Sequence, residues 1–378
     1  MIKLDKNRVK DNIEKRILAD VESGRVGGAS VIVKQKGEVI YENCFGLAGK
    51  GRELTSDTVF RLASMTKPIT CTAILKLIDR GLLSLDDNLD KFIPEYAEMN
   101  IGGLDENKSI VIKGKAKQKI KILHLLTHSS GVGCGILAEK LALSTTKENR
   151  TDLKSITDTY ACFPLSFEPY TAQAYSATLG FDLLARIAEI ISGMPYNEFL
   201  KKEIFEPLGM TDTTFIPTDE QWDRMISMHD YKDGHSTFLP IDRSQVFGGL
   251  PLTYFCGGAS LASTIKDYEK FADMLLAGGK TPSGEQLISE KLIELMRTPA
   301  VPEQIMPGNQ RWGLSVRVIT SEAYKRLPIN TFGWSGAYGC HFWVDPDNDI
   351  IAVYMKNSRF DGGSGATTAA HFEEDVYL

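Results

Sequence analysis

Apolar residues gather in short strand-like runs near both ends of the chain and follow a helical period between them. Residues 29–46 form two runs rich in β-branched and aromatic side chains, joined at Lys36-Gly37, which predicts a β-hairpin. Residues 311–356 contain four more such runs, with turn-forming residues at 345–349 before the last one. The pattern therefore predicts a hairpin near the start of the chain, after a short helix, and an antiparallel meander near its end.

Three helices are predicted between these strand-like regions. The first follows Ser64 and has one apolar face, with Gly81 at the expected C-terminal cap. The second covers residues 178–192 and ends at Gly193, and the third covers about residues 264–276. Each helix is long enough to pack an apolar stripe against a sheet or a neighbouring helix.

Strands at both ends with helices between them indicate an α/β (α+β) fold. Both chain ends are expected to build one antiparallel sheet flanked by helices, with a mostly helical region inserted in the middle. We expect residues 1–63 and 255–378 to form a discontinuous α/β domain and residues 64–254 to form the mostly helical domain. The active site is expected in the cleft between the two.

The composition excludes several classes of partner. The 378 residues are 43% apolar and 24% charged, which is typical of a globular protein, and the formal net charge is -6. This charge disfavours binding to nucleic acid or to an anionic membrane surface. A small-molecule substrate is therefore expected, and the sequence leaves the oligomeric state open.

The sequence also bears on the cellular location of the protein and on whether it binds a metal or a cofactor. The first residues scatter charges where a secretory signal needs an apolar run, and no apolar run is long enough to span a bilayer, so a cytoplasmic protein is expected. The alternative that this sequence is the mature form of an exported protein stays open. The histidines and cysteines show no metal-ligand spacing, so neither a metal nor a cofactor is expected, and the cysteines are expected to be buried free thiols.

The spacing Ser-x-x-Lys, which can bring a hydroxyl and an amine together on a helix, occurs three times. Residues 144–147 lie in a polar stretch that favours a surface loop or helix start, and residues 263–266 begin a helix whose first residues suit an N-cap. Only Ser64 stands between a strand-like run and a long amphipathic helix. Lys67 then lies about 4.5 Å further along the helix axis, within reach of the serine oxygen.

This pair has the residue types that nucleophilic catalysis needs. A serine hydroxyl is a poor nucleophile unless a neighbour accepts its proton, and a lysine can accept it when its amine is neutral. Burial and the positive end of a helix both favour the neutral amine. Ser64 is therefore the predicted nucleophile and Lys67 its proton partner, with a capping serine and a surface lysine as the alternative interpretation.

A resemblance to a known family rests on several segments that occur in order. They read RLASMTKPIT at 61–70, LLTHSSG at 125–131, PLGMTDTTF at 207–215 and GWSGAYGCHFWVDP at 333–346. Together they resemble the serine β-lactamase and penicillin-binding-protein superfamily, and within it the class C β-lactamases and the family VIII carboxylesterases. The resemblance covers about residues 28–356 and implies a β-lactamase-like fold.

The resemblance implies a role for each matching residue of the first two motifs. The first motif of the family falls on Ser64 and Lys67. The second, Tyr-x-Asn, falls on residues 175–177, where Tyr175 is retained and Ala177 stands in place of the asparagine. By this resemblance, the Tyr175 phenol shares a proton with Lys67 and serves as general base and then as general acid.

The third motif, Lys-Thr-Gly in β-lactamases, falls on residues 334–336. Here Trp334 replaces the lysine, and Ser335 and Gly336 follow it. The resemblance also implies an oxyanion hole formed by the backbone N–H groups of Ser64 and Ala337. Backbone donors survive changes of side chain, so this part of the site is expected to be intact.

The two departures from the family motifs both concern the recognition of charged substrates. β-Lactams and D-Ala-D-Ala peptides present a carboxylate and an amide, which a lysine and an asparagine recognise. Trp334 and Ala177 offer neither group, and family VIII esterases are similar in commonly having tryptophan at this place. We therefore expect a carboxylesterase that acts on small uncharged esters, with a β-lactamase, a D,D-peptidase or D-aminopeptidase, and an inactive ligand-binding protein as alternatives.

Overall fold

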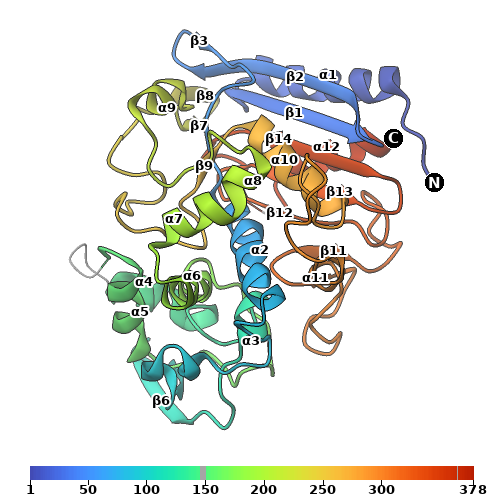
Figure 1. The fold of residues 1–378 in the computed structure, drawn as a ribbon. Coiled ribbons are helices and arrows are strands. Elements are labelled where there is room, and N and C mark those ends of the chain that lie inside the picture. Colours follow the sequence, from blue (N-terminus) through green and yellow to red (C-terminus); the bar gives the residue numbers. More distant parts are fainter. Residues whose placement is uncertain (145–149, 364) are drawn as a thin grey trace.

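The main sheet is built from strands near both ends of the chain in this computed structural model, which describes residues 1–144, 150–363 and 365–378 (Figure 1). The described residues form one eight-stranded sheet in the order β10-β11-β12-β13-β14-β1-β2-β3. Every neighbouring pair in it is antiparallel. Its strands are β1 (Gly28–Gln35), β2 (Glu38–Gly49), β3 (Arg52–Glu53), β10 (Gln310–Trp312), β11 (Arg317–Ile319), β12 (Phe332–Ser335), β13 (His341–Asp345) and β14 (Ile350–Met355).

The predicted hairpin and the way it fills the centre of the sheet are confirmed. Lys36 and Gly37 connect β1 to β2 with φ angles of 54° and 76°, the left-handed pair that suits a two-residue hairpin turn. Almost every residue of β1 is buried because both faces of the sheet are covered. Val31 packs into the cluster on one face, and Ile32 packs into the larger cluster on the other.

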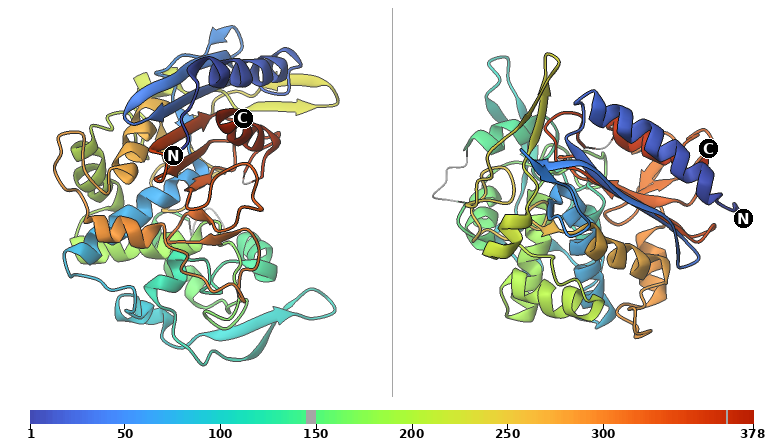
Figure 2. Two further views of the ribbon diagram at one scale, coloured as in Figure 1. Left: turned by 90° about the vertical axis from the view of Figure 1, so that its right-hand side faces the viewer. Right: turned by 90° about the horizontal axis from the view of Figure 1, so that it is seen from above.

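Helices from different parts of the chain cover the two faces. Helices α1 (Lys6–Glu22) and α12 (Thr367–Tyr377) pack against each other on one face, where both chain ends lie (Figure 2). Helix α10 (Ile265–Leu276) packs on the other face against β13 and β14. This arrangement agrees with the predicted sheet built by both chain ends and flanked by helices.

The mostly helical region lies on the side of the sheet that α10 covers, and its helices are grouped around α2 (Figure 1). Its short strands and helices, with those that connect it to the sheet, are β4 (Phe60–Arg61), η1 (Ala63–Met65), α2 (Thr66–Asp79), η2 (Leu89–Lys91), η3 (Pro94–Tyr96), β5 (Asn100–Leu104), β6 (Ile110–Lys115), α3 (Ile122–Leu126), η4 (Gly135–Leu137), α4 (Ala138–Ser144), α5 (Leu153–Ala161), α6 (Leu179–Ser192), α7 (Tyr196–Leu200), η5 (Lys201–Phe205), α8 (Glu206–Leu208), α9 (Asp219–Arg224), β7 (His229–Lys232), β8 (His235–Phe238), β9 (Ala262–Ser263) and α11 (Glu290–Met296).

All three predicted helices are present as α2, α6 and α10. Gly193 ends α6 in the left-handed conformation, and the Thr264 side chain caps α10 by accepting from the backbone N–H of Asp267. Helix α2 differs from the amphipathic helix that was predicted, because most of its side chains are buried on all sides. It lies in the interior of the molecule and packs against α6, which leaves it little surface facing water.

Two smaller expectations are corrected. The strand-like run at 311–319 is broken into β10 and β11, because Ser315 has a φ of 68° and the N–H of Gly313 donates to the Val316 carbonyl in a tight turn. All six cysteines are free thiols, as expected, but Cys162 is exposed and Cys44 is only partly buried. The division into two domains at residues 63/64 and 254/255 stays a prediction. In the part of the chain that the structure describes, no helix combines the length and the apolar character needed to cross a membrane.

Candidate active site

Ser64 lies in a tight turn between a short strand and the buried helix α2. Strand β4 pairs with β9, and the chain then enters the 3-10 turn η1, which leads directly into α2. Ala63 adopts a φ of 47°, which is uncommon for a residue with a side chain. Pro68 fits here because it is the third residue of α2, where the helix does not need its missing N–H group.

The glycine of the third motif is required by its approach to this turn. A Cβ atom on Gly336 would lie 2.2 Å from the carbonyl oxygen of Leu62, closer than real Cβ contacts allow. The end of β12 therefore packs directly against the backbone that carries Ser64. This contact explains how the first and third motifs, about 270 residues apart in sequence, come together.

Lys67 is completely buried and has three oxygen acceptors. Its Nζ lies 3.3 Å from Ser64 Oγ, 2.6 Å from the Ala177 carbonyl and 2.8 Å from the Gly258 carbonyl. An ammonium group satisfies all three by donating. A neutral amine has only two N–H groups, and because carbonyls cannot donate, both N–H groups go to them. The lone pair of the amine then faces the Ser64 hydroxyl, which is the arrangement that proton transfer from serine needs.

A buried carboxyl group lies close enough to this lysine to interact with it electrostatically. Asp182 in α6 accepts hydrogen bonds from the Tyr254 hydroxyl and from the Gly257 backbone N–H. Burial raises the pKa of Asp182, while these hydrogen bonds and the charge on Lys67 act against that rise.

Tyr175 lies just before α6 and reaches the same pocket. Its hydroxyl oxygen accepts a hydrogen bond from Trp334 Nε1 at 3.3 Å, and the centre of its ring lies 4.9 Å from Lys67 Nζ. Within the described residues, no hydrogen bond joins the phenol to Ser64 or Lys67. The structure therefore brings the three predicted catalytic side chains together, with Tyr175 held by Trp334.

Aromatic rings enclose Tyr175. Its ring centre lies 5.4 Å from that of Trp334, 6.1 Å from that of Trp312 and 4.5 Å from that of His128. The Nδ1 atom of His128 accepts a hydrogen bond from the Ser176 backbone N–H at 3.1 Å. Burial, together with the nearby charge of Lys67, lowers the pKa of His128 well below its usual value. His128 therefore packs beside the tyrosine as a buried ring whose pKa favours the neutral form.

A cavity of about 400 Å³ opens over these groups. Its lining residues come from both sides of the expected cleft: Ser64, Gln173, Tyr175, Met306, Gln310, Trp312, Arg317, Trp334, Ser335, Ala337 and Gly363. The backbone N–H of Ala337 has no acceptor among the described residues, as an oxyanion-hole donor requires. Of the residues expected to contact substrate, Trp334 and Ser335 are among the described residues that line this cavity, whereas Ala177 and Gly336 are not.

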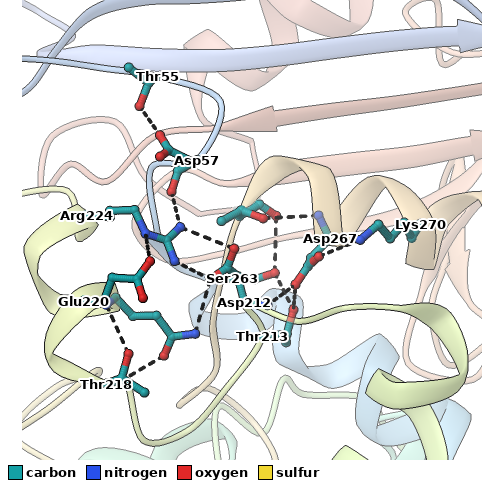
Figure 3. Close-up of polar contacts among 12 residues, drawn as sticks. Thr55, Asp57, Asp212, Thr213, Thr218, Glu220, Arg224, Ser263, Asp267 and Lys270 are labelled. Atoms are coloured by element: carbon teal, nitrogen blue, oxygen red, sulfur yellow. Dashed lines mark hydrogen bonds and ion pairs between the residues drawn. The ribbon is translucent and has the colours of Figure 1, made fainter.

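The other Ser-x-x-Lys pairs do not form such a site. Figure 3 shows Ser263 in a polar network, where its Oγ lies 2.8 Å from that of Thr213. Lys266 instead forms ion pairs with Glu42 and Glu269 at 2.6 and 3.6 Å, and 41% of its side chain is exposed. In the pair Ser144 and Lys147, the lysine lies outside the described residues.

Sequence reasoning missed several parts of the pocket. Trp312 and Arg317 come from β10 and β11, which the sequence showed only as one strand-like run. Trp312 carried a usable signal, because pockets are lined mainly by apolar and aromatic side chains and this tryptophan lies in a strand-like run before the third motif. The Ala177 and Gly258 carbonyls that hold Lys67 could not be found from the sequence, because every residue has a carbonyl group.

Comparison with known proteins agrees with this geometry. A family model described as Beta-lactamase matches residues 13–373. The chain is 29% identical over 373 residues to Esterase EstB of Burkholderia gladioli, covering 92% of this chain and 90% of that protein. It is 30% identical over 362 residues to Protein Rv1367c of Mycobacterium tuberculosis, covering 88% and 86%. The solved structure of EstCE1, a hydrolase with promiscuous acyltransferase activity, superposes with a TM-score of 0.82 at 23% identity, covering 99% of both chains.

Proposed function

Because this chain belongs to the beta-lactamase family, we propose that it is a serine hydrolase that cleaves small uncharged esters through an acyl-enzyme on Ser64. The observation that carries this proposal is the placement of Lys67, whose two carbonyl partners leave one direction open, toward Ser64 Oγ. A similarity to Esterase EstB at 29% identity supports an ester as substrate, and so does one to Lovastatin esterase of Penicillium rubens at 32% identity over 54% of this chain.

The acylation step uses the groups that face the cavity. Ser64 Oγ attacks the ester carbonyl carbon while its proton passes to Lys67 Nζ, and the carbonyl oxygen becomes an oxyanion. The backbone N–H groups of Ser64 and Ala337 stabilise this oxyanion, a contribution of about 3 to 4 kcal/mol for one such donor. The bond to the alcohol then breaks, and the alcohol oxygen takes up the proton from the Lys67 and Tyr175 pair.

Deacylation repeats these steps with water. Water attacks the acyl carbon, its proton passes to the Tyr175 and Lys67 pair, and Ser64 Oγ leaves with a proton as the carboxylic acid is released. The hydrogen bond from Trp334 Nε1 to the Tyr175 oxygen stabilises negative charge on the phenol. Trp334 thus positions the proton-transfer group in addition to forming an apolar wall.

The side chains of the cavity wall favour uncharged substrates. Trp334 and Trp312 form one side, with ring centres 4.5 Å apart. Arg317 also lines the cavity, but its guanidinium donates to the buried carboxylate of Glu373 at 2.6 Å, so its charge is already compensated. A substrate carboxylate would lose its hydration here without gaining an unpaired cation.

A comparison of two chromogenic substrates tests this proposal. The purified protein is expected to hydrolyse p-nitrophenyl butyrate with a kcat/KM at least about 100 times that for the β-lactam nitrocefin, because a lost charge-assisted contact and an apolar wall both disfavour the charged substrate. Trp334→Lys is the matched variant, and it should move the ratio toward nitrocefin. Faster turnover of nitrocefin by the unmodified protein would overturn the ester assignment, and absence of both activities would favour an inactive ligand-binding protein.

A further inference from the structure

Ser335 is the cavity-lining end of a buried chain of polar side chains that the catalytic steps above do not use. Ser335 and His341 are directly opposite each other on the paired strands β12 and β13. Ser335 Oγ lies 2.8 Å from His341 Nδ1, and His341 Nε2 lies 3.1 Å from Glu373 Oε1 in helix α12. All three residues are buried, and Ser335 lines the same cavity as Ser64.

Glu373 is the fixed end of this chain. Arg317 donates to its Oε1 atom at 2.6 Å, and Arg326 and the Tyr324 hydroxyl donate to its Oε2 atom at 2.9 and 2.7 Å. Burial alone would raise the pKa of Glu373, but the hydrogen bond from His341 and the charge of Arg317 hold it well below its usual value. Glu373 is therefore a carboxylate that can only accept hydrogen bonds.

This carboxylate determines which nitrogen of His341 carries the proton. Because Glu373 cannot donate, the hydrogen between it and His341 belongs to Nε2. Burial lowers the pKa of His341 and the charge of Arg317 acts in the same direction, so the ring is neutral, although the Glu373 carboxylate and a hydrogen bond to the Trp334 backbone partly offset this lowering. In a neutral ring with a protonated Nε2, Nδ1 has a lone pair. Ser335 must then donate its only hydroxyl proton to His341.

We propose that Ser335 presents only hydrogen-bond acceptors to the cavity and that it thereby determines substrate specificity. A freely rotating serine could donate a hydrogen bond to a substrate carboxylate. Ser335 instead donates its hydroxyl proton to His341, so that its two oxygen lone pairs can only accept hydrogen bonds from other groups. The site then favours esters that carry a hydroxyl or amide N–H near β12, and it rejects carboxylates by repulsion between acceptors. This inference rests on the proposed esterase function and names a substrate class for it.

Two matched pairs of p-nitrophenyl esters test the proposal. The hemisuccinate carries a carboxylate where its isostere, the 4-methylpentanoate, carries an isopropyl group, and the 3-hydroxybutyrate carries a hydroxyl where the 3-methylbutyrate carries a methyl. His341→Phe removes the acceptor of the Ser335 proton while leaving Glu373 its arginine and tyrosine partners. The ratio of kcat/KM for the hemisuccinate to that for its isostere should then rise about tenfold, as expected for a new hydrogen bond to a charged group.

The control variants distinguish the effect of the Ser335 hydroxyl on specificity from general damage to the site. The double variant Ser335→Ala with His341→Phe should lose this gain, because no hydroxyl remains to donate. Ser335→Ala alone should lower the preference for the 3-hydroxybutyrate over its isostere by roughly fivefold, the contribution of one neutral hydrogen bond. An unchanged hemisuccinate ratio in folded His341→Phe, or the same gain in the double variant, would overturn the proposal.

A spectroscopic test needs no substitution in the buried chain. In the unmodified protein, long-range ¹H–¹⁵N correlation spectra should show His341 Nε2 as the protonated nitrogen and Nδ1 as the unprotonated one. The opposite tautomer, or a doubly protonated ring at neutral pH, would refute the proposal even if the His341→Phe variant does not fold. Failure of the esterase assignment itself is distinguishable, because it would abolish turnover of all four esters while leaving this spectrum unaffected.

Discussion

Ser64 and Ser263 share the same Ser-x-x-Lys spacing at the start of a helix, yet only one of them forms a serine and lysine pair. Lys67 is completely buried and its Nζ lies 3.3 Å from Ser64 Oγ. Lys266 is partly exposed and forms ion pairs with glutamates, while Ser263 bonds to Thr213 (Figure 3). The spacing is therefore not sufficient to make a catalytic pair.

The difference lies in the backbone between the two residues. Ser64 belongs to the 3-10 turn that runs into α2, so the serine and Lys67 are on successive turns of one helical path. Ser263 is the last residue of β9, and the extended N-cap residue Thr264, with φ -96° and ψ 164°, separates it from α10. The four residues from Ser263 to Lys266 pass from a strand through the cap into the first helical turn, so the two side chains do not lie on a common face.

The largest expected effect comes from removing each serine hydroxyl. Ser64→Ala should lower kcat/KM for p-nitrophenyl butyrate by about 10⁴ or more, because the atom that becomes acylated is gone. Ser263→Ala should change kcat/KM by less than about twofold, since the hydrogen bonds of that hydroxyl within the described part of the chain go to Thr213 and to the Thr264 carbonyl. Steady-state assays on variants with matched thermal unfolding would reveal the contrast, and a large loss in Ser263→Ala would contradict it.

Replacing each lysine by methionine keeps most of the side-chain volume and removes the amine. Lys67→Met should lower kcat by about 10³, because general-base catalysis typically contributes 10² to 10⁴ and this amine also orients Ser64. Lys266→Met should leave kcat within about twofold of the unmodified protein. Single-turnover kinetics would locate the Lys67 effect in the acylation step, and a similar loss for both variants would show that the burial of Lys67 is irrelevant to catalysis.

A smaller effect is expected from the groups that hold Tyr175 near Ser64. Trp334→Phe keeps an aromatic wall but removes the Nε1–H group that donates to the Tyr175 oxygen. The loss of one hydrogen bond should lower kcat/KM by roughly fivefold to tenfold. Trp312→Phe is the control, because Trp312 contacts Tyr175 through its ring face and has no hydrogen bond to the phenol. Equal losses in the two variants would mean that the donor to Tyr175 does not matter.

The network around Ser263 should affect stability and leave catalysis unchanged. Burial would raise the pKa of Asp212, but hydrogen bonds from Arg224 and Gln221 hold it below its usual value of 3.8. A lowered pKa stabilises the folded state above pH 3.8, and this stabilisation is lost as the pH falls through the lower value. Asp212→Asn should therefore lower the free energy of unfolding by about 1 kcal/mol or less at pH 7.

Denaturant unfolding across pH measures this difference. The gap between Asp212→Asn and the unmodified protein should narrow as the pH falls below 3.8, while kcat at neutral pH stays within about twofold. A gap that does not change with pH would mean that Asp212 acts through packing and not through its charge.

The sequence predicted the parts of this molecule that side-chain pattern determines. The hairpin at Lys36-Gly37 and helix α6 were predictable because periodicity and left-handed turn residues are local signals. The convergence of the three predicted catalytic residues with Trp334 and Ala337 followed from resemblance to known motifs. Helices α7, α8 and α11 are too short to show a period, so they were not predicted.

Other parts of the site depend on contacts that no local pattern encodes. The carbonyls of Ala177 and Gly258 hold Lys67 through backbone atoms, which are the same in every residue. The link from Ser335 to Glu373 joins the meander to the last helix, and its residues have no fixed spacing in sequence. Only the folded chain reveals which of several serines, histidines and glutamates meet.

The most direct test of the central claim is to locate the acyl group itself. Protein mixed with excess p-nitrophenyl butyrate and quenched in acid within one turnover should gain the mass of one butyryl group. Peptide mapping should place that group on Ser64 in the unmodified protein, and it should be missing in Ser64→Ala. A butyryl group on a peptide that contains Ser263 or Ser335, with residue 64 unmodified, would contradict the account.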